Sequence, residues 1–354
     1  MRKIKARETV RRLSPYVCAR DLYKKAEIFM DANENAFGST AQFEGVDLNR
    51  YPDSDLLELR GKLAEYVGGG LTSENVMVGN GSDEIIDLAI RTFAEKGDNI
   101  ITVEPGYSMF NVCAEISGVK IRAVLVEDDF QPNVDKVLAK IDENTKMIVI
   151  ISPNSPLGNV VELERIKEIA EKANCVVFVD EAYGEFAGKT LAPLVLEYEN
   201  LIVSKTLSKA WGLAALRVGY AIANKKIIEN LRKIKAPYNV GAIPNYLALK
   251  ALENKARMEN WVNEMMLEKE WLEKQLRNSN LEVFPTVTNF SVFRIPKEFD
   301  SKLVSKAIAE KGIVVRDRSS LSLMENCIRV TVGTKSENER FIKALREVIR
   351  IWKK

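Results

Sequence analysis

Short runs of apolar residues recur through the middle of the chain. They occupy residues 100–103, 147–151, 176–179, 201–203 and 218–223. Such short runs, rich in Val and Ile, are typical of strands that are buried on both faces. Apolar residues at helical spacing lie between several of these runs, as in Ile85, Ile86, Ala89, Ile90 and Phe93. Alternating strands and helices predict an α/β fold, with a mainly parallel sheet that helices cover on both faces.

The pattern changes after about residue 240. Residues 245–276 predict one long helix rich in Glu and Lys. Beyond it, the sequence predicts strands at 281–284, 290–295, 313–315 and 327–332, and helices at 301–311 and 336–352. This mixture indicates a smaller α+β domain. We therefore predict a large domain over 42–240 and a small domain formed by 241–354 together with an N-terminal arm, 1–41.

The composition narrows the possible chemistry mainly because the chain of 354 residues has no histidine. Without an imidazole there is no Ser-His-Asp triad and no histidine-ligated metal site, so catalysis must use other side chains or a cofactor. The net charge is +2, from 52 basic and 50 acidic residues, and the two signs are interspersed. This pattern argues against nucleic-acid binding. We interpret the basic cluster at 2–12 as the solvated start of a helix.

The cysteines and the apolar segments bear on the cellular location. Cys18, Cys113, Cys175 and Cys327 lie more than sixty residues apart, which predicts free thiols in a reducing compartment and no CxxC metal site. No apolar segment approaches the roughly twenty residues that span a bilayer. The basic N-terminus lacks the apolar region of a signal peptide. We expect a cytoplasmic protein with no metal, membrane or nucleic-acid partner.

The most informative segment, SKTLSKAWGLAALRVGY at 204–220, lies between two predicted strands. It sets Lys209 among small and hydroxyl residues, with Arg217 eight positions later. Lysine forms Schiff bases with carbonyl cofactors and its free amine can move protons, while the donor fork of arginine can hold a phosphate. A solitary lysine is far more often an exposed surface group, so this hypothesis depends on the surrounding residues.

This segment resembles the lysine motif of pyridoxal-phosphate-dependent aminotransferases of fold type I, specifically that of the histidinol-phosphate aminotransferases, a family of class II aminotransferases. The resemblance implies that Lys209 binds the cofactor, pyridoxal 5'-phosphate, and that Lys205, four residues earlier, has no such role. It also implies that Arg217 binds the cofactor's phosphate. Ser208 and Thr206 occupy the family's hydroxyl positions beside the lysine.

A predicted buried strand runs directly into Asp180, in the segment VVFVDEAYGEF at 176–186. Alone, such an aspartate would be expected to cap the next turn. In front of the lysine motif, the segment resembles the family's Asp-Glu-Ala-Tyr signature. The resemblance implies that Asp180 pairs with the cofactor's pyridine nitrogen and keeps it protonated, since a nearby anion favours the cationic form. Tyr183 would donate to the cofactor's ring oxygen, and the catalytic residues would be Lys209, Asp180 and Tyr183.

Three further segments match family positions around the cofactor. VGNGSDE at 78–84 precedes a predicted helix, whose free N–H groups form an anion site, and resembles the family's phosphate cup at Ser82 and Asp83. The resemblance also implies that Tyr107 stacks on the cofactor. In NRYPD at 49–53, it implies that Tyr51 reaches the cofactor phosphate of a neighbouring subunit, which requires a homodimer. Without the resemblance, each segment has a simpler interpretation. Residues 78–84 would be a strand-to-helix turn, Tyr107 a core aromatic, and residues 49–53 a turn around Pro52.

The resemblance places Tyr16, Asn33, Asn239, Arg316 and Arg329 on the substrate side. Arg316 and Arg329 each follow apolar residues and would be costly to bury without an anion. In the family, the equivalents of Tyr16, Arg316 and Arg329 gather the substrate's phosphate. The equivalent of Arg329 can also take the α-carboxylate of amino-acid and oxo-acid partners. Two convergent arginines fit an anionic substrate without saying which one.

One loop departs from the family pattern. The family's Pro-Asn-Asn-Pro-Thr-Gly reads PNSPLG at 153–158, so Ser155 stands where an asparagine normally donates to the cofactor's ring oxygen. Losing a hydrogen bond to a charged oxygen costs about 1.5 to 3 kcal/mol if nothing replaces it. Asn154 and Ser155 remain candidate cofactor ligands. We predict that Tyr183 keeps the site functional.

The resemblance extends from Tyr16 to Gly333, with the motifs in the family's order. It implies transfer of the amino group of L-histidinol phosphate to 2-oxoglutarate, giving imidazole-acetol phosphate and glutamate, in histidine biosynthesis. Two enzymes on the same scaffold are alternatives, an aromatic amino-acid aminotransferase and a threonine-phosphate-type decarboxylase. A non-catalytic regulator that binds the cofactor, or a pseudoenzyme suggested by Ser155, is the alternative outside catalysis.

Overall fold

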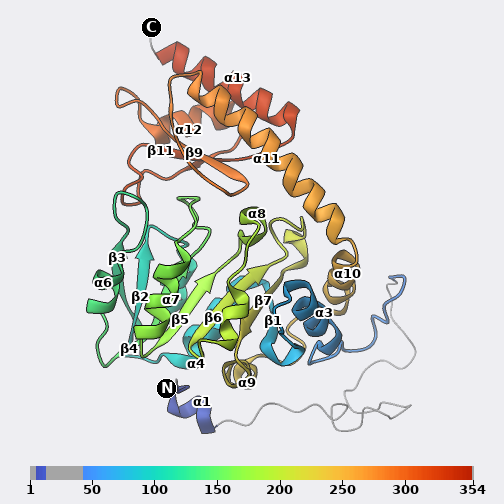
Figure 1. Ribbon diagram of the computed structural model, residues 1–354. Helices are drawn as coiled ribbons and strands as arrows, with labels where there is room; N and C mark the ends of the chain where they lie inside the picture. Colours follow the sequence, from blue (N-terminus) through green and yellow to red (C-terminus); the bar gives the residue numbers. More distant parts are fainter. Residues whose placement is uncertain (1–4, 13–42, 353–354) are drawn as a thin grey trace.

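The large sheet of the computed structural model, which describes residues 5–12 and 43–352, has seven strands in the order β1-β7-β6-β5-β4-β2-β3 (Figure 1). The strands are β1 (Val76–Asn80), β2 (Asn99–Glu104), β3 (Lys120–Leu125), β4 (Thr145–Ile151), β5 (Val176–Asp180), β6 (Leu201–Thr206) and β7 (Val218–Ala223). Only β7 runs antiparallel to its neighbours. The five predicted strands and the mainly parallel sheet are confirmed. Both edge strands, β1 and β3, were missed. In β3 the alternating, partly exposed residues give no continuous apolar run.

Helices cover both faces of the large sheet, because successive side chains of a strand point to opposite faces. On β5, Val177 and Val179 join one core, and Val176 and Phe178 join the other. The helices of this part are α1 (Glu8–Arg12), α3 (Leu57–Val67), α4 (Gly81–Phe93), α5 (Met109–Ile116), α6 (Val134–Ala139), α7 (Leu163–Lys172), α8 (Gly184–Ala187), α9 (Lys225–Ile234) and α10 (Ala242–Leu252). Short 3-10 turns lie at Ser73–Asn75, Ala192–Leu196 and Ala214–Leu216.

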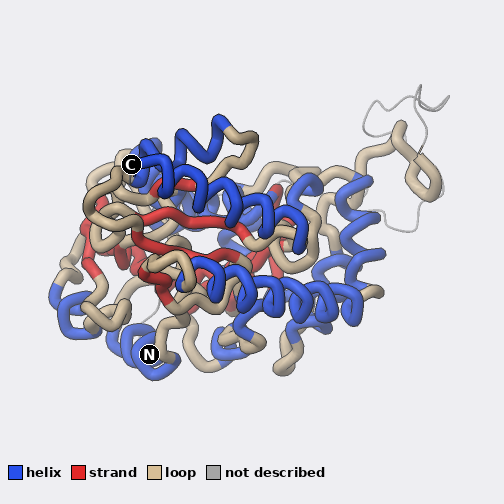
Figure 2. Tube along the Cα trace, turned by 90° about the horizontal axis from the view of Figure 1, so that it is seen from above, coloured by secondary structure: helices blue, strands red, loops and turns tan. Residues whose placement is uncertain are grey.

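A second, antiparallel sheet has the strand order β10-β11-β9-β8. It consists of β8 (Glu282–Phe284), β9 (Phe290–Arg294), β10 (Arg316–Asp317) and β11 (Cys327–Thr331), with helices α11 (Lys255–Arg277), α12 (Ser301–Glu310) and α13 (Lys335–Trp352). Phe293 and Ile328 pack against these helices, whereas Phe290 and Cys327 belong to a core of the large sheet. The small sheet is therefore helix-covered on one face and meets the large unit with the other (Figures 1 and 2).

Two predicted elements of the second half are wrong. The single helix at 245–276 is two helices, because α10 ends at Leu252 and α11 begins at Lys255. Between them, Asn254 Nδ2 donates to Lys250 O at 2.9 Å, the kind of side-chain contact with which asparagine competes against helix continuation. The strand predicted at 313–315 lies instead at Arg316–Asp317. Ile313 and Val315 pack on the helical core of the small sheet, so their apolar character reports packing and not strand pairing.

Candidate active site

Most of the predicted site residues lie along one edge of the large sheet, the edge formed by the carboxyl ends of its parallel strands. Asp180 ends β5, Thr206 ends β6, and Lys209 follows in the next loop. Arg217 precedes β7, whose antiparallel direction brings its first residue to the same edge, beside the end of β1. In sheets of this kind, ligands bind beyond the carboxyl ends of the parallel strands. The topology therefore assembles a site from motifs that are far apart in the sequence.

Asp180 is a buried carboxylate with one unused oxygen. It is 3% exposed, and its Oδ1 accepts hydrogen bonds from Ser204 Oγ at 2.9 Å and from Ala182 N at 3.0 Å. Burial raises the pKa of Asp180 to about 6, although these hydrogen bonds and the nearby charge of Lys209 act to lower it. Among the described residues, no hydrogen bond ends on Oδ2. A ligand that carries a cationic N–H group would complement this oxygen.

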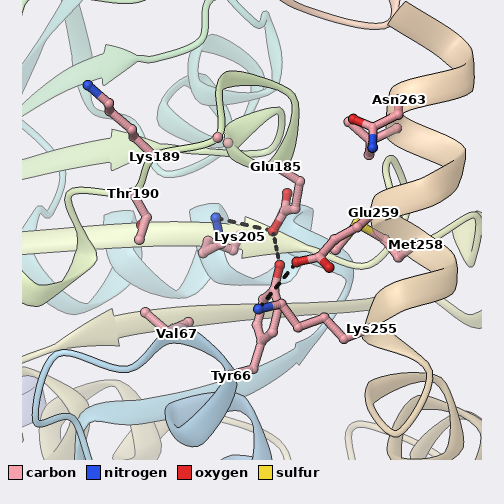
Figure 3. A pocket seen from close by; sticks show the side chains of 13 residues that line it. Tyr66, Val67, Glu185, Lys189, Thr190, Lys205, Lys255, Met258, Glu259 and Asn263 are labelled. Carbon is pink, nitrogen blue, oxygen red and sulfur yellow. Dashed lines mark hydrogen bonds and ion pairs between the residues drawn. The ribbon is translucent and has the colours of Figure 1, made fainter.

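The structure separates the two lysines of the 204–220 motif. Lys209 is exposed, and its Nζ lies 5.5 Å from the centroid of the Tyr183 ring. The side chain of Lys205 is 3% exposed, and its Nζ lies 3.2 Å from Glu185 Oε1 (Figure 3). The same Nζ lies 3.3 Å from Glu181 Oε2. Lys205 therefore has a structural ion pair inside the fold, and only Lys209 has an amine available to a ligand.

The start of α4 and Arg217 lie together and make a candidate anion site. Gly81 opens the helix at φ +78°, and a Cβ there would lie 2.4 Å from Arg217 Nη2. A Cβ on Gly219 would lie 2.3 Å from Ser82 N, so β7 approaches the helix start as closely as only glycine allows. Arg217 Nη2 donates to Asp83 Oδ2 at 3.2 Å. A guanidinium and the free N–H groups at a helix start suit a phosphate.

Other cofactor candidates lie around this anion site. Tyr107 Oη donates to Asp83 Oδ1 at 3.0 Å, and burial followed by the charge of Asp83 raises the pKa of Tyr107. Thr206 Oγ1 donates to Ser208 Oγ at 3.0 Å, so the two hydroxyl groups hold one another beside Lys209. Asn239 is also here, because its Nδ2 donates to Glu84 Oε2 at 2.7 Å. The structure thus places Asn239 at the start of α4.

The loop at 153–158, which differs from the family pattern, connects the large unit to the small sheet. Asn154 is buried, and its side chain holds the loop by donating to Pro105 O at 3.2 Å and accepting from Leu157 N at 3.1 Å. Ser155 Oγ accepts a hydrogen bond from Arg329 Nη1 at 2.9 Å. Ser155 therefore contacts a predicted substrate-side arginine.

The substrate-side arginines are brought together by strand pairing. Arg316 on β10 is the Cα partner of Arg329 on β11. Burial lowers the pKa of Arg329, whose guanidinium lies 5.2 Å from the centroid of the Phe290 ring.

Tyr51, the predicted contact to a neighbouring subunit, stacks on Tyr238, with ring centroids 4.6 Å apart and ring planes at 15°.

Two predicted residues, Tyr16 and Asn33, lie outside the described residues, as does Cys18. The other three cysteines are free and buried. The sequence did not single out Ser204, which donates to Asp180. Ser204 lies two positions before Thr206 in an apolar strand, so the two polar side chains share a face of the sheet, and this pattern could have indicated a site there. The described residues contain no cluster of His, Cys, Asp and Glu suited to a metal, and no described helix is long and apolar enough to cross a membrane.

These residues fit pyridoxal 5'-phosphate. The anion site at α4 suits its phosphate, Asp180 Oδ2 suits its ring nitrogen, and Lys209 Nζ suits its carbonyl. Residues 27–345 match the family model described as aminotransferase class I and II. The fold and the site thus define a pyridoxal-phosphate-dependent aminotransferase of fold type I, as the sequence predicted.

Relatives identify the family within this class. The histidinol-phosphate aminotransferase of Cytophaga hutchinsonii is 40% identical over 345 residues, covering 96% of this chain and 97% of that protein. The corresponding protein of Bacteroides thetaiotaomicron is 38% identical over 350 residues, with 96% and 97% covered. The chain belongs to the histidinol-phosphate aminotransferase family, and the resemblance found in its sequence is confirmed.

Solved structures agree with this fold. The histidinol-phosphate aminotransferase of Sinorhizobium meliloti, in complex with pyridoxal-5'-phosphate, is 25% identical, with a TM-score of 0.79 and 90% of each chain covered. The L-threonine-O-3-phosphate decarboxylase of Porphyromonas gingivalis is 21% identical, with a TM-score of 0.72 and coverage of 86% and 91%. At that identity the second match shows a common fold and carries no conclusion about its reaction.

Proposed function

We propose that this enzyme transfers the amino group of L-histidinol phosphate to 2-oxoglutarate, giving imidazole-acetol phosphate and glutamate in histidine biosynthesis. The observation that carries the proposal is the pairing of Arg316 with Arg329 across β10 and β11, beside the edge that holds Lys209. Among the described residues neither arginine has a carboxylate partner in an ion pair, so both can bind substrate anions. Full-length relatives named for this activity support the choice.

The cofactor side follows from the residues at the sheet edge. Bound pyridoxal phosphate would supply a carbonyl that takes up the substrate amine and a ring that stores the electron pair released at Cα. Asp180 Oδ2 would hold the ring nitrogen, and Tyr183 the ring oxygen. The backbone N–H groups of Ser82 and Asp83, with Arg217, would bind the phosphate.

Lys209 would do the proton transfer. Lys209 is exposed with its Nζ over the Tyr183 ring, and the amine would take the proton from the substrate's Cα and deliver it to the former carbonyl carbon of the cofactor. Thr206 and Ser208 would hold the phosphate side of the pocket, and Tyr107 would stack on the ring. Asn154 and Ser155 are further candidates for contact with the cofactor.

The substrate side would divide two anions between two arginines. Arg329 would bind the α-carboxylate of 2-oxoglutarate or glutamate, and Arg316 the phosphate of histidinol phosphate. We propose that Tyr16, Asn33 and Asn239 complete this side. The absence of histidine does not obstruct the chemistry, since each proton and anion has another residue assigned to it.

A half-reaction screen tests the proposal. The purified enzyme with its cofactor is mixed with histidinol phosphate, phenylalanine, tyrosine and phosphothreonine, and the visible absorbance of the cofactor is followed. We expect the fastest bleaching with histidinol phosphate. Faster reaction with the aromatic amino acids would replace the substrate while keeping the reaction class. Carbon dioxide release from phosphothreonine would indicate the decarboxylase, and a band that no amine changes would indicate a regulator.

We further propose a homodimer in which Tyr51 of each subunit contacts the cofactor phosphate of the other. Tyr51 is 51% exposed although it is aromatic, which suits a residue that reaches a partner. Mixing Lys209→Ala with Tyr51→Phe subunits provides the test. If sites are shared, hybrid dimers contain one site with both defects and one intact site, so mixing restores activity. Activity that stays at the average of the two parents contradicts a shared site.

The predicted domains and location also remain proposals. We propose a large domain over 42–240 and a small domain over 241–354 with the arm 1–41, although Ala248 of α10 packs in a core of the large sheet. Limited proteolysis tests the boundary: cleavage before α10 supports it, and cleavage only between α10 and α11 would move α10 to the large domain. Buried free thiols at Cys113, Cys175 and Cys327 suit a reducing compartment, and we propose the cytoplasm. Cell fractionation with antibody detection tests this location.

A further inference from the structure

A third arginine, Arg318, lies beside Arg316 and Arg329 on the small sheet. Arg316 and Arg329 are Cα partners in the antiparallel pair β10–β11. Two residues later, Arg318 N donates to Cys327 O at 2.8 Å and extends the pairing by one position. Because side chains alternate along a strand, Arg318 shares a face with Arg316 and with the cross-strand Arg329.

This shared face points toward the active site. Arg329 Nη1 reaches Ser155 Oγ at 2.9 Å, and Tyr183 affects the pKa of both Arg318 and Arg329. Asp317, between Arg316 and Arg318 in the sequence, turns the other way and accepts from Ser301 Oγ at 2.6 Å. By this alternation the three arginines lie on one face of the small sheet, the face on which Arg329 reaches Ser155, and Asp317 lies on the other.

The guanidinium of Arg318 has no anion of its own. Within the described ranges, 5–12 and 43–352, none of the three arginines forms an ion pair, and Arg318 Nε is buried without a hydrogen-bond partner. Burial, followed by the charges of Arg329 and Arg316, lowers the pKa of Arg318 to about 10. A half-buried cation held near two others is unfavourable until an anion binds.

We propose that Arg318 is a third anion ligand of this site and binds the phosphate of the amino donor together with Arg316. The inference rests on the proposed function, because it assigns a phosphorylated amine to the site. A phosphate monoester carries up to two charges and three terminal oxygens, so it can accept from two guanidinium groups at once. A single carboxylate has only two oxygens, and one guanidinium group can occupy both of them. Arg318 thereby selects a phosphorylated donor over a neutral aromatic one, and Arg329, held by Ser155, serves the carboxylate.

The test compares Arg318→Gln and Arg318→Lys with the wild-type chain, each carrying its cofactor. The measurements are kcat and KM for histidinol phosphate, for unphosphorylated histidinol and for 2-oxoglutarate, together with the inhibition constant of inorganic phosphate. For Arg318→Gln we expect KM for histidinol phosphate and the inhibition constant of phosphate to rise about 10- to 100-fold. Both parameters for histidinol stay unchanged, and those for 2-oxoglutarate change less than those for histidinol phosphate, because Arg329 holds its α-carboxylate. For Arg318→Lys we expect a smaller loss than for Arg318→Gln, because lysine keeps the positive charge but lacks the paired donors of the guanidinium group.

Arg294→Gln is the matched control. Arg294 belongs to the same small sheet, on β9, but its Nη1 donates to Glu282 Oε2 at 3.1 Å, so its charge is already neutralised. We expect this variant to leave the inhibition constant of phosphate at the wild-type value. A similar rise in both variants would show a general effect of disturbing the sheet and would overturn the role of Arg318.

Two other results would also overturn it. An unchanged inhibition constant of phosphate in Arg318→Gln removes Arg318 from the anion site. If the substitution weakens only the binding of the oxo acid, Arg318 is a ligand of a carboxylate and not of the phosphate. The phosphate arm is independent of the donor: if the wild-type enzyme uses histidinol as well as histidinol phosphate, the proposed function fails, while the inhibition constants still decide whether Arg318 binds phosphate.

Discussion

Arg329 Nη1 donates a hydrogen bond to Ser155 Oγ at 2.9 Å, and this contact joins the small sheet to the loop that follows β4. Ser155 is one of the two residues of this loop that depart from the family pattern. The contact gives this position a role through the arginine, in addition to the predicted role beside the cofactor. A substitution at Ser155 therefore tests how firmly Arg329, the proposed substrate arginine, must be held.

For Ser155→Ala, we expect a higher KM for 2-oxoglutarate, by about tenfold, because Arg329 loses the acceptor that orients it. Because Tyr183 remains, kcat should change little. Steady-state kinetics with varied 2-oxoglutarate measures both values. Ser155→Asn restores the family residue, and we expect only a modest gain in turnover. A hundredfold gain would instead mean that the serine impairs the natural loop.

Lys209→Ala and Lys205→Met should fail in different ways. Lys209→Ala removes the exposed amine, so we expect activity and borohydride fixation of the cofactor to be lost while the fold is kept. Lys205→Met leaves Glu181 and Glu185 buried without their cationic partner, which should cost about 3 to 5 kcal/mol of unfolding free energy. Denaturant unfolding and peptide mapping after borohydride reduction measure these effects. Fixation of the cofactor at Lys205 would contradict the assignment.

Asp180→Asn should stabilise the enzyme from which the cofactor has been removed, while abolishing activity. The pKa of Asp180 is raised from 3.8 to about 6, so the folded state binds a proton more tightly than the unfolded state. Ionisation therefore lowers stability as pH rises through this window, by about 3 kcal/mol at pH 8.

Unfolding of both cofactor-free proteins is measured at pH 4 and at pH 8. The advantage of Asp180→Asn should be full at pH 8 and largely absent at pH 4, where the wild-type carboxyl group is protonated in the fold. An advantage that does not change with pH would show that ionisation of Asp180 is not its cause.

Gly219→Ala should damage the anion site although its backbone conformation suits alanine. The new Cβ would lie 2.3 Å from Ser82 N, so the start of α4 must shift. We expect weaker cofactor binding and a loss of about 1 to 3 kcal/mol of unfolding free energy. Cofactor titration and thermal unfolding measure the two effects.

Gly61→Ala provides the control for that substitution. Gly61 lies inside α3, and a Cβ there meets nothing within 4 Å. Alanine should stabilise the helix by about 0.5 to 1 kcal/mol and leave cofactor binding unchanged. Equal losses of cofactor affinity in the two variants would contradict the specific contact between β7 and α4.

Much of the large sheet could be predicted because its central strands are buried on both faces. Such a strand has apolar residues at successive positions, which the sequence shows as a continuous apolar run. The edge strand β3 and the short strand β10 lack that signal, since few of their residues are enclosed. The break at Asn254 depends on one local hydrogen bond, which the surrounding helical pattern conceals.

The sequence by itself determined the fold class, the family and the candidate lysine for the cofactor, because these depend on residue types at fixed local spacing. Only the tertiary structure separated buried Lys205 from exposed Lys209 by their surroundings and brought Arg217 to the start of α4. It also set Ser155 against Arg329 and placed Arg318 beside the paired arginines. Such contacts join residues far apart in the chain, so they follow from strand order and pairing, which no single segment of sequence encodes.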